Sequence, residues 1–155
     1  MTATDFATQL KIVLAERGLE AAIALLNSFT GCRFTSMFRF DGRMLRPLTF
    51  YDRADPAAEP PEDIPVEASY CVFVRDTGLP FRVDDSSADV RVEHHPKRRE
   101  ILAYCGVPLK DEYGITFGTL CHFDVRAVPI TDADVRRMED FARIVNEVAT
   151  LRKPS

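Results

Sequence analysis

The sequence predicts an α+β domain built on a mainly antiparallel sheet, with helices at both ends of the chain. Three observations support this class. Helical patterns at residues 5–29 and 130–152 enclose a middle part that reads as strands. The pair Asp41-Gly42 lies between two strand patterns and is a strong hairpin signal. The segment KDEYG at 110–114 is a turn between two more strands.

The N-terminal helix is predicted in two pieces. Phe6, Leu10, Val13 and Leu14 recur at the spacing of one helical face. Gly18 indicates a break, after which a second piece continues to residue 29.

Strand periodicity begins in CRFTSMFRFDGRMLRPLTFY, where Phe34, Phe38 and Phe40 alternate with other side chains. Four prolines in RADPAAEPPEDIPV at 53–66 then predict a surface connection, because proline is excluded from central strands and helix interiors. A short helix is expected at 67–76, with Gly78 beyond its end. It is followed by a strand at 80–85, a loop at 86–97 and a short helix at 97–102.

Two longer strands are predicted at 102–110 and 115–125. Gly106 and Gly118 lie inside these patterns, where glycine indicates the close approach of another backbone or side chain. Pro108 lacks a backbone N–H, so its strand should be at an edge or bulged there. Asp124 ends the second strand, which favours a capping or turn role.

The C-terminal helix begins after Thr131, whose hydroxyl can cap it, with Asp132 and Asp134 near its positive end. One face carries apolar residues at three-four spacing, namely Val135, Met138, Ala142, Val145 and Ala149. This face suits packing on a sheet, and equally a seam with the helix of a partner.

Composition bounds the class of protein. The 155 residues fit one domain, with N-terminal helices at 1–30, sheet and pocket at 31–127 and the last helix at 130–152. The net charge of -4 argues against nucleic-acid binding, and no apolar run is long enough for a membrane span. Because the N-terminus lacks signal-peptide features, we expect a cytoplasmic protein with reduced cysteines at 32, 71, 105 and 121.

Two segments resemble a known family. VEASYCVFVRDTGLPFRVDD and ILAYCGVPLKDEYGITFGTLCHFD are similar, in order and spacing, to motifs of the GAF domain, a sensory module of bacterial signalling proteins. The resemblance implies a central antiparallel sheet of five or six strands. It also implies terminal helices on one face, and loops and short helices that roof a pocket on the other.

From this resemblance we expect a sensory domain that binds a small molecule and catalyses nothing itself. The candidate ligand-binding residues are Cys71, Phe73, Asp84, Arg91, His94, Tyr104, Cys105 and Cys121. The expected partners are an unidentified small molecule, a second copy of the chain joined through the terminal helices, and a separate signalling protein.

Two alternatives stay open. The free methionine-(R)-sulfoxide reductases are GAF proteins, and Cys71 matches one of their cysteines. Their catalytic cysteine lies about eleven residues before the strand proline, where this chain has Lys97, so the nucleophile is missing. The other alternative is a protein-interaction module with a filled core and no ligand.

Cofactor and thiol chemistry is weakly supported by the residues. Cys121 and His122 are neighbours on a strand, so their side chains point to opposite faces and cannot form a dyad. Haem bound through His94 or His95 is one option. A cyclic nucleotide held by Arg91, Arg98 and Arg99 is another. No spacing typical of a zinc site is present.

Overall fold

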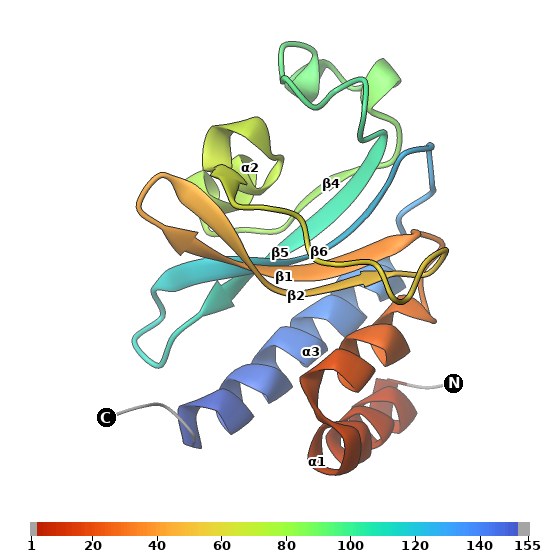
Figure 1. The fold of residues 1–155 in the computed structure, drawn as a ribbon, viewed down its shortest axis with the longest axis vertical. Helices are drawn as coiled ribbons and strands as arrows, with labels where there is room; N and C mark the ends of the chain where they lie inside the picture. Colours follow the sequence, from red (N-terminus) through yellow and green to blue (C-terminus); the bar gives the residue numbers. More distant parts are fainter. Residues whose placement is uncertain (1–2, 152–155) are drawn as a thin grey trace.

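The computed structural model describes the backbone of residues 3–151 and the side chains of residues 5–147. Six strands form one antiparallel sheet in the order β3-β2-β1-β6-β5-β4 (Figure 1). The strands are β1 (Phe34–Asp41), β2 (Met44–Asp52), β3 (Ile64–Pro65), β4 (Phe81–Val83), β5 (Ala103–Lys110) and β6 (Thr116–Asp124). The predicted fold class is therefore confirmed.

Each face of the sheet is covered by different elements. Helices α1 (Ala3–Asn27) and α3 (Asp132–Leu151) lie together on one face, and α2 (Cys71–Thr77) lies on the other with the connecting segments (Figure 1). Two hydrophobic clusters result, one on each side of the sheet. Because both faces are buried, the strands carry apolar side chains in both directions.

The terminal helices follow the predicted patterns. Gly18 interrupts α1 with φ 86° and ψ -175°, a backbone conformation that side-chain-bearing residues rarely adopt. Thr131 and Asp134 cap α3 reciprocally, since the Asp134 N–H donates to Thr131 Oγ1 and the Thr131 N–H donates to Asp134 Oδ2, each at 3.0 Å.

The apolar face of α3 packs on the chain's own sheet. Met138 and Val145 belong to the buried cluster on that side, and Val135 and Ala142 pack against it. The side chain of Ala149 lies outside the described residues. This face is therefore occupied within one copy of the chain, and the homodimer through the terminal helices stays a prediction.

Three special residues of the strands have the predicted roles. A Cβ on Gly118 would overlap the carbonyl oxygen of Phe38 on the paired strand β1. Pro108 lies beyond the short β4, which pairs only with Tyr104–Gly106 of β5, so one side of β5 is an unpaired edge at Pro108. Asp124 accepts from the backbone N–H of Arg126 at 3.2 Å, as expected for a turn.

Two short segments differ from the prediction. Residues 97–101 form a turn instead of a helix, because only Glu100 and Ile101 donate back to Lys97 before the chain extends into β5. Residues 64–65 form the edge strand β3 within the proline-rich connection. Pro65 is tolerated there because an edge strand is paired on one side only.

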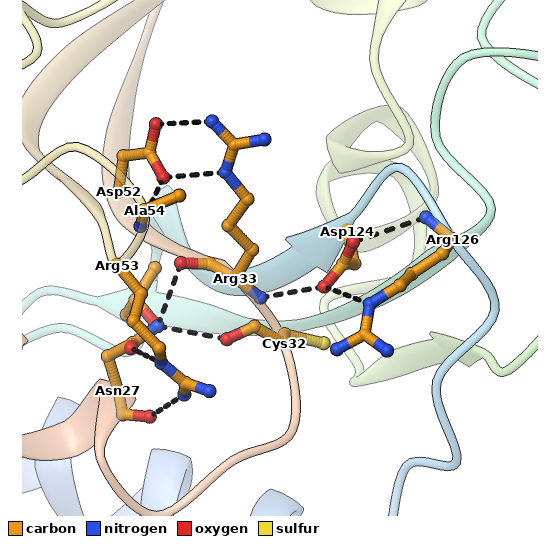
Figure 2. A network of polar contacts seen from close by, with 9 residues as sticks. Asn27, Cys32, Arg33, Asp52, Arg53, Ala54, Asp124 and Arg126 are labelled. Carbon is orange, nitrogen blue, oxygen red and sulfur yellow. Dashed lines mark hydrogen bonds and ion pairs between the residues drawn. The ribbon is translucent and has the colours of Figure 1, made fainter.

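A partly buried polar junction joins the end of α1 to the ends of β1, β2 and β6 (Figure 2). Asn27 donates to the carbonyl oxygens of Cys32 and Arg33, and the Arg53 side chain donates to Asn27 Oδ1 at 2.8 Å. The Arg33 guanidinium makes a bidentate pair with Asp52 at 2.7 and 2.8 Å. Asp124 accepts from the Arg33 N–H at 2.8 Å. These bonds hold helix α1 in a fixed position relative to the sheet.

Candidate functional site

A cavity of about 200 Å³ lies on the sheet face that α2 covers. Strands β1, β2, β5 and β6 contribute to its wall, and residues 61–71, 97 and 101 close it from the other side. The wall is mostly aliphatic and aromatic: Phe38, Leu45, Pro61, Ile64, Ala68, Tyr70, Ile101 and Phe123. Ligand sites in proteins typically combine such an apolar wall with a few polar groups that fix orientation.

The polar part of the cavity is organised around the sulfur of Cys71, the first residue of α2. The Tyr104 hydroxyl donates to Cys71 Sγ at 3.3 Å, and the Thr119 hydroxyl donates to it at 3.2 Å. Tyr104 comes from β5 and Thr119 from β6, so both donors are fixed by the sheet. Cys121, two residues after Thr119 on the same strand face, also lines the cavity.

Gly106 makes room for the Tyr104 ring. A Cβ on Gly106 would overlap the hydroxyl and ring atoms of Tyr104, which lies two residues away on the same face of β5. Gly106 pairs with Cys121 across the β5–β6 ladder, so the ring lies beside Cys121. The glycine therefore allows the Tyr104 hydroxyl to reach Cys71.

The thiols of the chain have contrasting environments. Burial raises the pKa of the Cys71 thiol, but donation from the Cys121 thiol and from the hydroxyls of Ser69, Thr119 and Tyr104 outweighs it, and the pKa falls below its ordinary value. Burial and the interaction with Cys71 raise the pKa of Cys121 well above its usual range. The two thiols therefore act as a pair, in which the first proton leaves from Cys71.

Charged groups lie at the rim of the cavity. Lys97 and Glu62 both contribute to its wall, and Lys97 Nζ makes an ion pair with Glu100 Oε2 at 3.1 Å. The Lys97 side chain is about one-third exposed, which lets its ammonium group face the cavity or the solvent. A lysine at this position can hold an anionic group of a ligand.

His95 fastens this rim to the neighbouring segment. Its Nδ1 accepts from the Lys97 N–H at 3.0 Å, so the ring hydrogen is on Nε2, which donates to the Ser69 carbonyl oxygen at 3.1 Å. The ring packs on Tyr70 at 4.5 Å, and burial lowers the pKa of His95. The imidazole is therefore neutral, and both its nitrogen atoms have partners.

Three of the eight predicted ligand-binding residues line the cavity: Cys71, Tyr104 and Cys121. Cys105 does not, because it pairs with His122 across β5–β6 and thus points to the helix side of the sheet. There, burial raises its pKa to about 12. The prediction that Cys105 and Cys121 share a cavity is corrected by this register.

The other four predicted residues also lie outside the cavity wall. Phe73 stacks on Phe81 of β4 at 4.4 Å. Asp84 accepts from the Ile130 N–H at 3.2 Å and so fixes the approach to α3. Arg91 is held by Asp89 and by the Arg82 carbonyl oxygen.

His94 is the most exposed of these residues. Its side chain is 92% exposed and pairs with Glu93, away from the cavity. Arg91 and His94 lie in residues 86–100, which fold as short 3-10 helices and turns, and a sequence pattern does not define the direction of side chains in such segments.

The proposed cofactors find little support in this donor set. Neither His94 nor His95 offers a haem ligand at the cavity, because His94 points to solvent and both nitrogens of His95 are engaged. Two of the three arginines considered for a cyclic phosphate are held by the chain itself, since Arg91 donates to Asp89 and Arg98 donates to the Ser86 and Ser87 carbonyl oxygens. Within residues 5–147, no cluster of three or more His, Cys, Asp or Glu side chains is placed to hold a metal ion.

Sequence reasoning missed most of the apolar wall and its rim. Tyr70, Lys97 and Ile101 come from the segments that connect β2 to β5, and only folding brings them over the strands they cover. The two features that could have pointed to the site were Gly106 and the match of Lys97 to the catalytic position of the reductases.

The family model of the GAF domain matches residues 15–148. The chain belongs to the GAF domain family. Among curated protein sequences, none matches this GAF domain. Within residues 3–151, no helix has the length and apolar character needed to cross a membrane.

Solved structures of other GAF proteins resemble this fold. The GAF domain of the phosphoenolpyruvate-protein phosphotransferase from Acinetobacter has a TM-score of 0.75 at 10% identity, covering 97% of this chain and 95% of that one. A putative GAF sensor protein from Burkholderia vietnamiensis has a TM-score of 0.69 at 18% identity, with 95% of each chain covered.

An enzyme is also among the similar structures. The free methionine-R-sulfoxide reductase from Neisseria meningitidis, solved in complex with its substrate, has a TM-score of 0.73 at 18% identity. The match covers 94% of this chain and 86% of the reductase. At this identity the likeness establishes the fold alone, so it does not decide between sensor and enzyme.

Proposed function

We propose that this GAF domain is a sensory module that binds a small molecule in the cavity beneath α2. The observation that carries the proposal is the cavity itself, with an apolar wall, the hydroxyl of Tyr104 and the two thiols inside, and Lys97 at the rim. These groups suit a compact ligand with an apolar body and one anionic group. Ligand binding in this fold family supports the same interpretation.

The proposed signal passes from the cavity to the terminal helices through β6. Cys121 and Phe123 face the cavity, and His122 between them faces the helices, where its Nδ1 lies 2.7 Å from Thr35 Oγ1. The same hydroxyl accepts from Asn27 at the end of α1. A ligand that favours one arrangement of β6 would therefore bias α1, with a typical coupling of about 1–3 kcal/mol. The output would then require a second copy of the chain or a separate signalling protein.

The proposal can be tested with a variant that fills the cavity. Ala68 lines the cavity, so Ala68→Phe should remove the ligand space, whereas Ala57→Phe places the same ring on the exposed connection and serves as control. A panel of small carboxylates and phosphates is screened by thermal shift. At 100-fold excess over Kd, a true ligand should add about 2.7 kcal/mol to the stability of the wild type.

We expect this stabilisation in the wild type and in Ala57→Phe, and its loss in Ala68→Phe. If every compound that stabilises the wild type stabilises Ala68→Phe equally, the cavity is not the binding site. If the compound does bind in the cavity, hydrogen exchange in its presence should show added protection in residues 61–101, because these residues close the cavity.

A second candidate function is sulfoxide reduction, favoured by the lowered pKa of Cys71 and by the fold shared with the reductases. Lys97 argues against this function, because it stands where the reductases have their catalytic cysteine. An amine cannot replace that thiol, which attacks the sulfoxide and is then oxidised to a disulfide. An assay of free methionine-(R)-sulfoxide with the purified protein and dithiothreitol separates the two functions. We expect no turnover from the wild type, and sustained turnover would favour the enzyme.

A further inference from the structure

We propose that Cys71 and Cys121 are a redox-active thiol pair, which a small hydroperoxide entering the cavity oxidises to an intramolecular disulfide. The inference adds redox regulation to the cavity of the proposed sensor. Only the effect of oxidation on ligand binding rests on the proposed function; disulfide formation itself does not. It is carried by the arrangement of donors around Cys71 and by the position of Cys121.

The surroundings of Cys71 are those of a sulfur anion. A thiol is a weak acceptor and rarely attracts several donors, whereas two hydroxyls from different strands donate to Cys71 Sγ at 3.2 and 3.3 Å. The backbone around Ser69 holds a third hydroxyl near it, since Ser69 Oγ accepts from the Cys71 N–H at 3.1 Å. Donors of this kind lower the pKa of Cys71, and the thiolate is the form that attacks peroxides.

Cys121 is placed to resolve the oxidised sulfur. Cys71 Sγ contacts Thr119, and Cys121 lies two residues further on the same face of β6, where its thiol interacts with Cys71. Both side chains line one cavity, which provides a path for a molecule of peroxide size even though each residue is only 1% exposed.

The two remaining cysteines lack the features that make Cys71 and Cys121 reactive. Cys32 and Cys105 are buried in the cluster on the helix side of the sheet, and burial raises the pKa of each to about 12. Neither lines the cavity. Oxidation should therefore be selective for the pair on the cavity side.

The chemistry balances without a cofactor. The Cys71 thiolate attacks one oxygen of the hydroperoxide, the O–O bond breaks, and the leaving alkoxide or hydroxide takes a proton to give an alcohol or water. Cys71 is then a sulfenic acid. The Cys121 sulfur attacks the Cys71 sulfur, a disulfide forms and water leaves. Two electrons pass from the two thiols to the peroxide.

Disulfide formation would also change the cavity. A sulfur–sulfur bond is about 2.05 Å long, so α2 and β6 must approach each other where both line the cavity wall. We expect the oxidised protein to lose the small-molecule binding proposed above.

The test uses the full chain, reduced, freed of reductant and treated with hydrogen peroxide. Remaining thiols are then alkylated under denaturing conditions and mapped by mass spectrometry. We expect two of the four cysteines to resist alkylation, with a peptide that links Cys71 to Cys121. Cys121→Ser should stop at a sulfenic acid on Cys71 that dimedone traps, and Cys105→Ser should form the link as the wild type does.

The role of the hydroxyl donors is tested by the pH profile of Cys71 alkylation. Tyr104→Phe keeps the ring but removes the donor, so the midpoint of the profile should move to higher pH while the fold is retained.

The inference is overturned if peroxide links other cysteines, if Cys71 reacts no faster than Cys105 in the folded protein, or if only links between chains form. These results do not depend on any ligand. Failure of the disulfide would leave ligand binding standing, and failure of the ligand screen would leave the disulfide standing.

Discussion

The buried His122 offers a sharp test of how the helix side of the sheet is built. Its imidazole is 1% exposed on β6, and Thr35 Oγ1 lies 2.7 Å from its Nδ1. Burial, with the nearby charges of Arg53 and Arg137, lowers the pKa of His122 from 6.5 to about 3. The ring is therefore neutral in the folded protein above about pH 3.

For this reason, the free energy of unfolding should decrease as the pH is lowered. In the unfolded chain His122 takes a proton near pH 6.5, whereas the folded protein resists protonation until about pH 3. The contribution is thus fully present above pH 6.5 and is lost as the pH falls toward 3. Between pH 8 and pH 5 the unfolded state gains about 2 kcal/mol relative to the folded state from this one group.

The measurement is urea unfolding followed by circular dichroism at pH 8 and pH 5, for the wild type and for His122→Gln, which cannot titrate. The free energy of unfolding should drop by about 2 kcal/mol more in the wild type than in the variant between these pH values. His94→Gln is the matched control, because it makes the same substitution at an exposed histidine. Equal pH dependence in the wild type and His122→Gln would refute the reasoning, because it would mean that His122 protonates in the folded state.

Three other substitutions test separate parts of the fold. Gly118→Ala should destabilise the protein by about 1–3 kcal/mol or more, because the added Cβ meets the Phe38 carbonyl oxygen and separates β1 from β6. A urea midpoint equal to that of the wild type would contradict this. Phe141→Ala should cost about 3–5 kcal/mol in the same assay, since the ring is completely buried between α3 and the sheet. In Asp52→Asn, the loss of stability should be largest above pH 4 and shrink in acid. The hydrogen bond and charge of Arg33 hold the pKa of Asp52 below its ordinary 3.8, so the pair stabilises only the ionised carboxylate. A stability difference between this variant and the wild type that is constant from pH 7 to pH 3 would exclude that role.

Much of the fold could be predicted because it depends on local rules. The Asp41-Gly42 turn, the break at Gly18 and the cap at Thr131 each follow from the conformations that those residues favour, and each is present. The short helix expected at 97–102 was wrong, because one turn of backbone hydrogen bonds there gives way to β5. Local preference does not decide such segments when a neighbouring strand offers better pairing.

The candidate site was predicted only in part. Cys71, Tyr104 and Cys121 lie at the cavity, whereas Arg91 and His94 are on turns whose side chains point elsewhere. The sheet pattern fixes side-chain direction by alternation, but turns have no such period.

Alternation by itself determined that Cys121 and His122 point to opposite faces of their strand, and the sequence alone excluded a thiol–imidazole dyad there. It did not determine which face holds the cavity, because both faces of the sheet are covered and both carry apolar residues. The tertiary structure decided this through the β5–β6 register, which places Cys105 beside His122 and Gly106 beside Cys121. A shift of one residue would exchange the two faces, and only the packing of α1, α3 and α2 against them selects the register that is present.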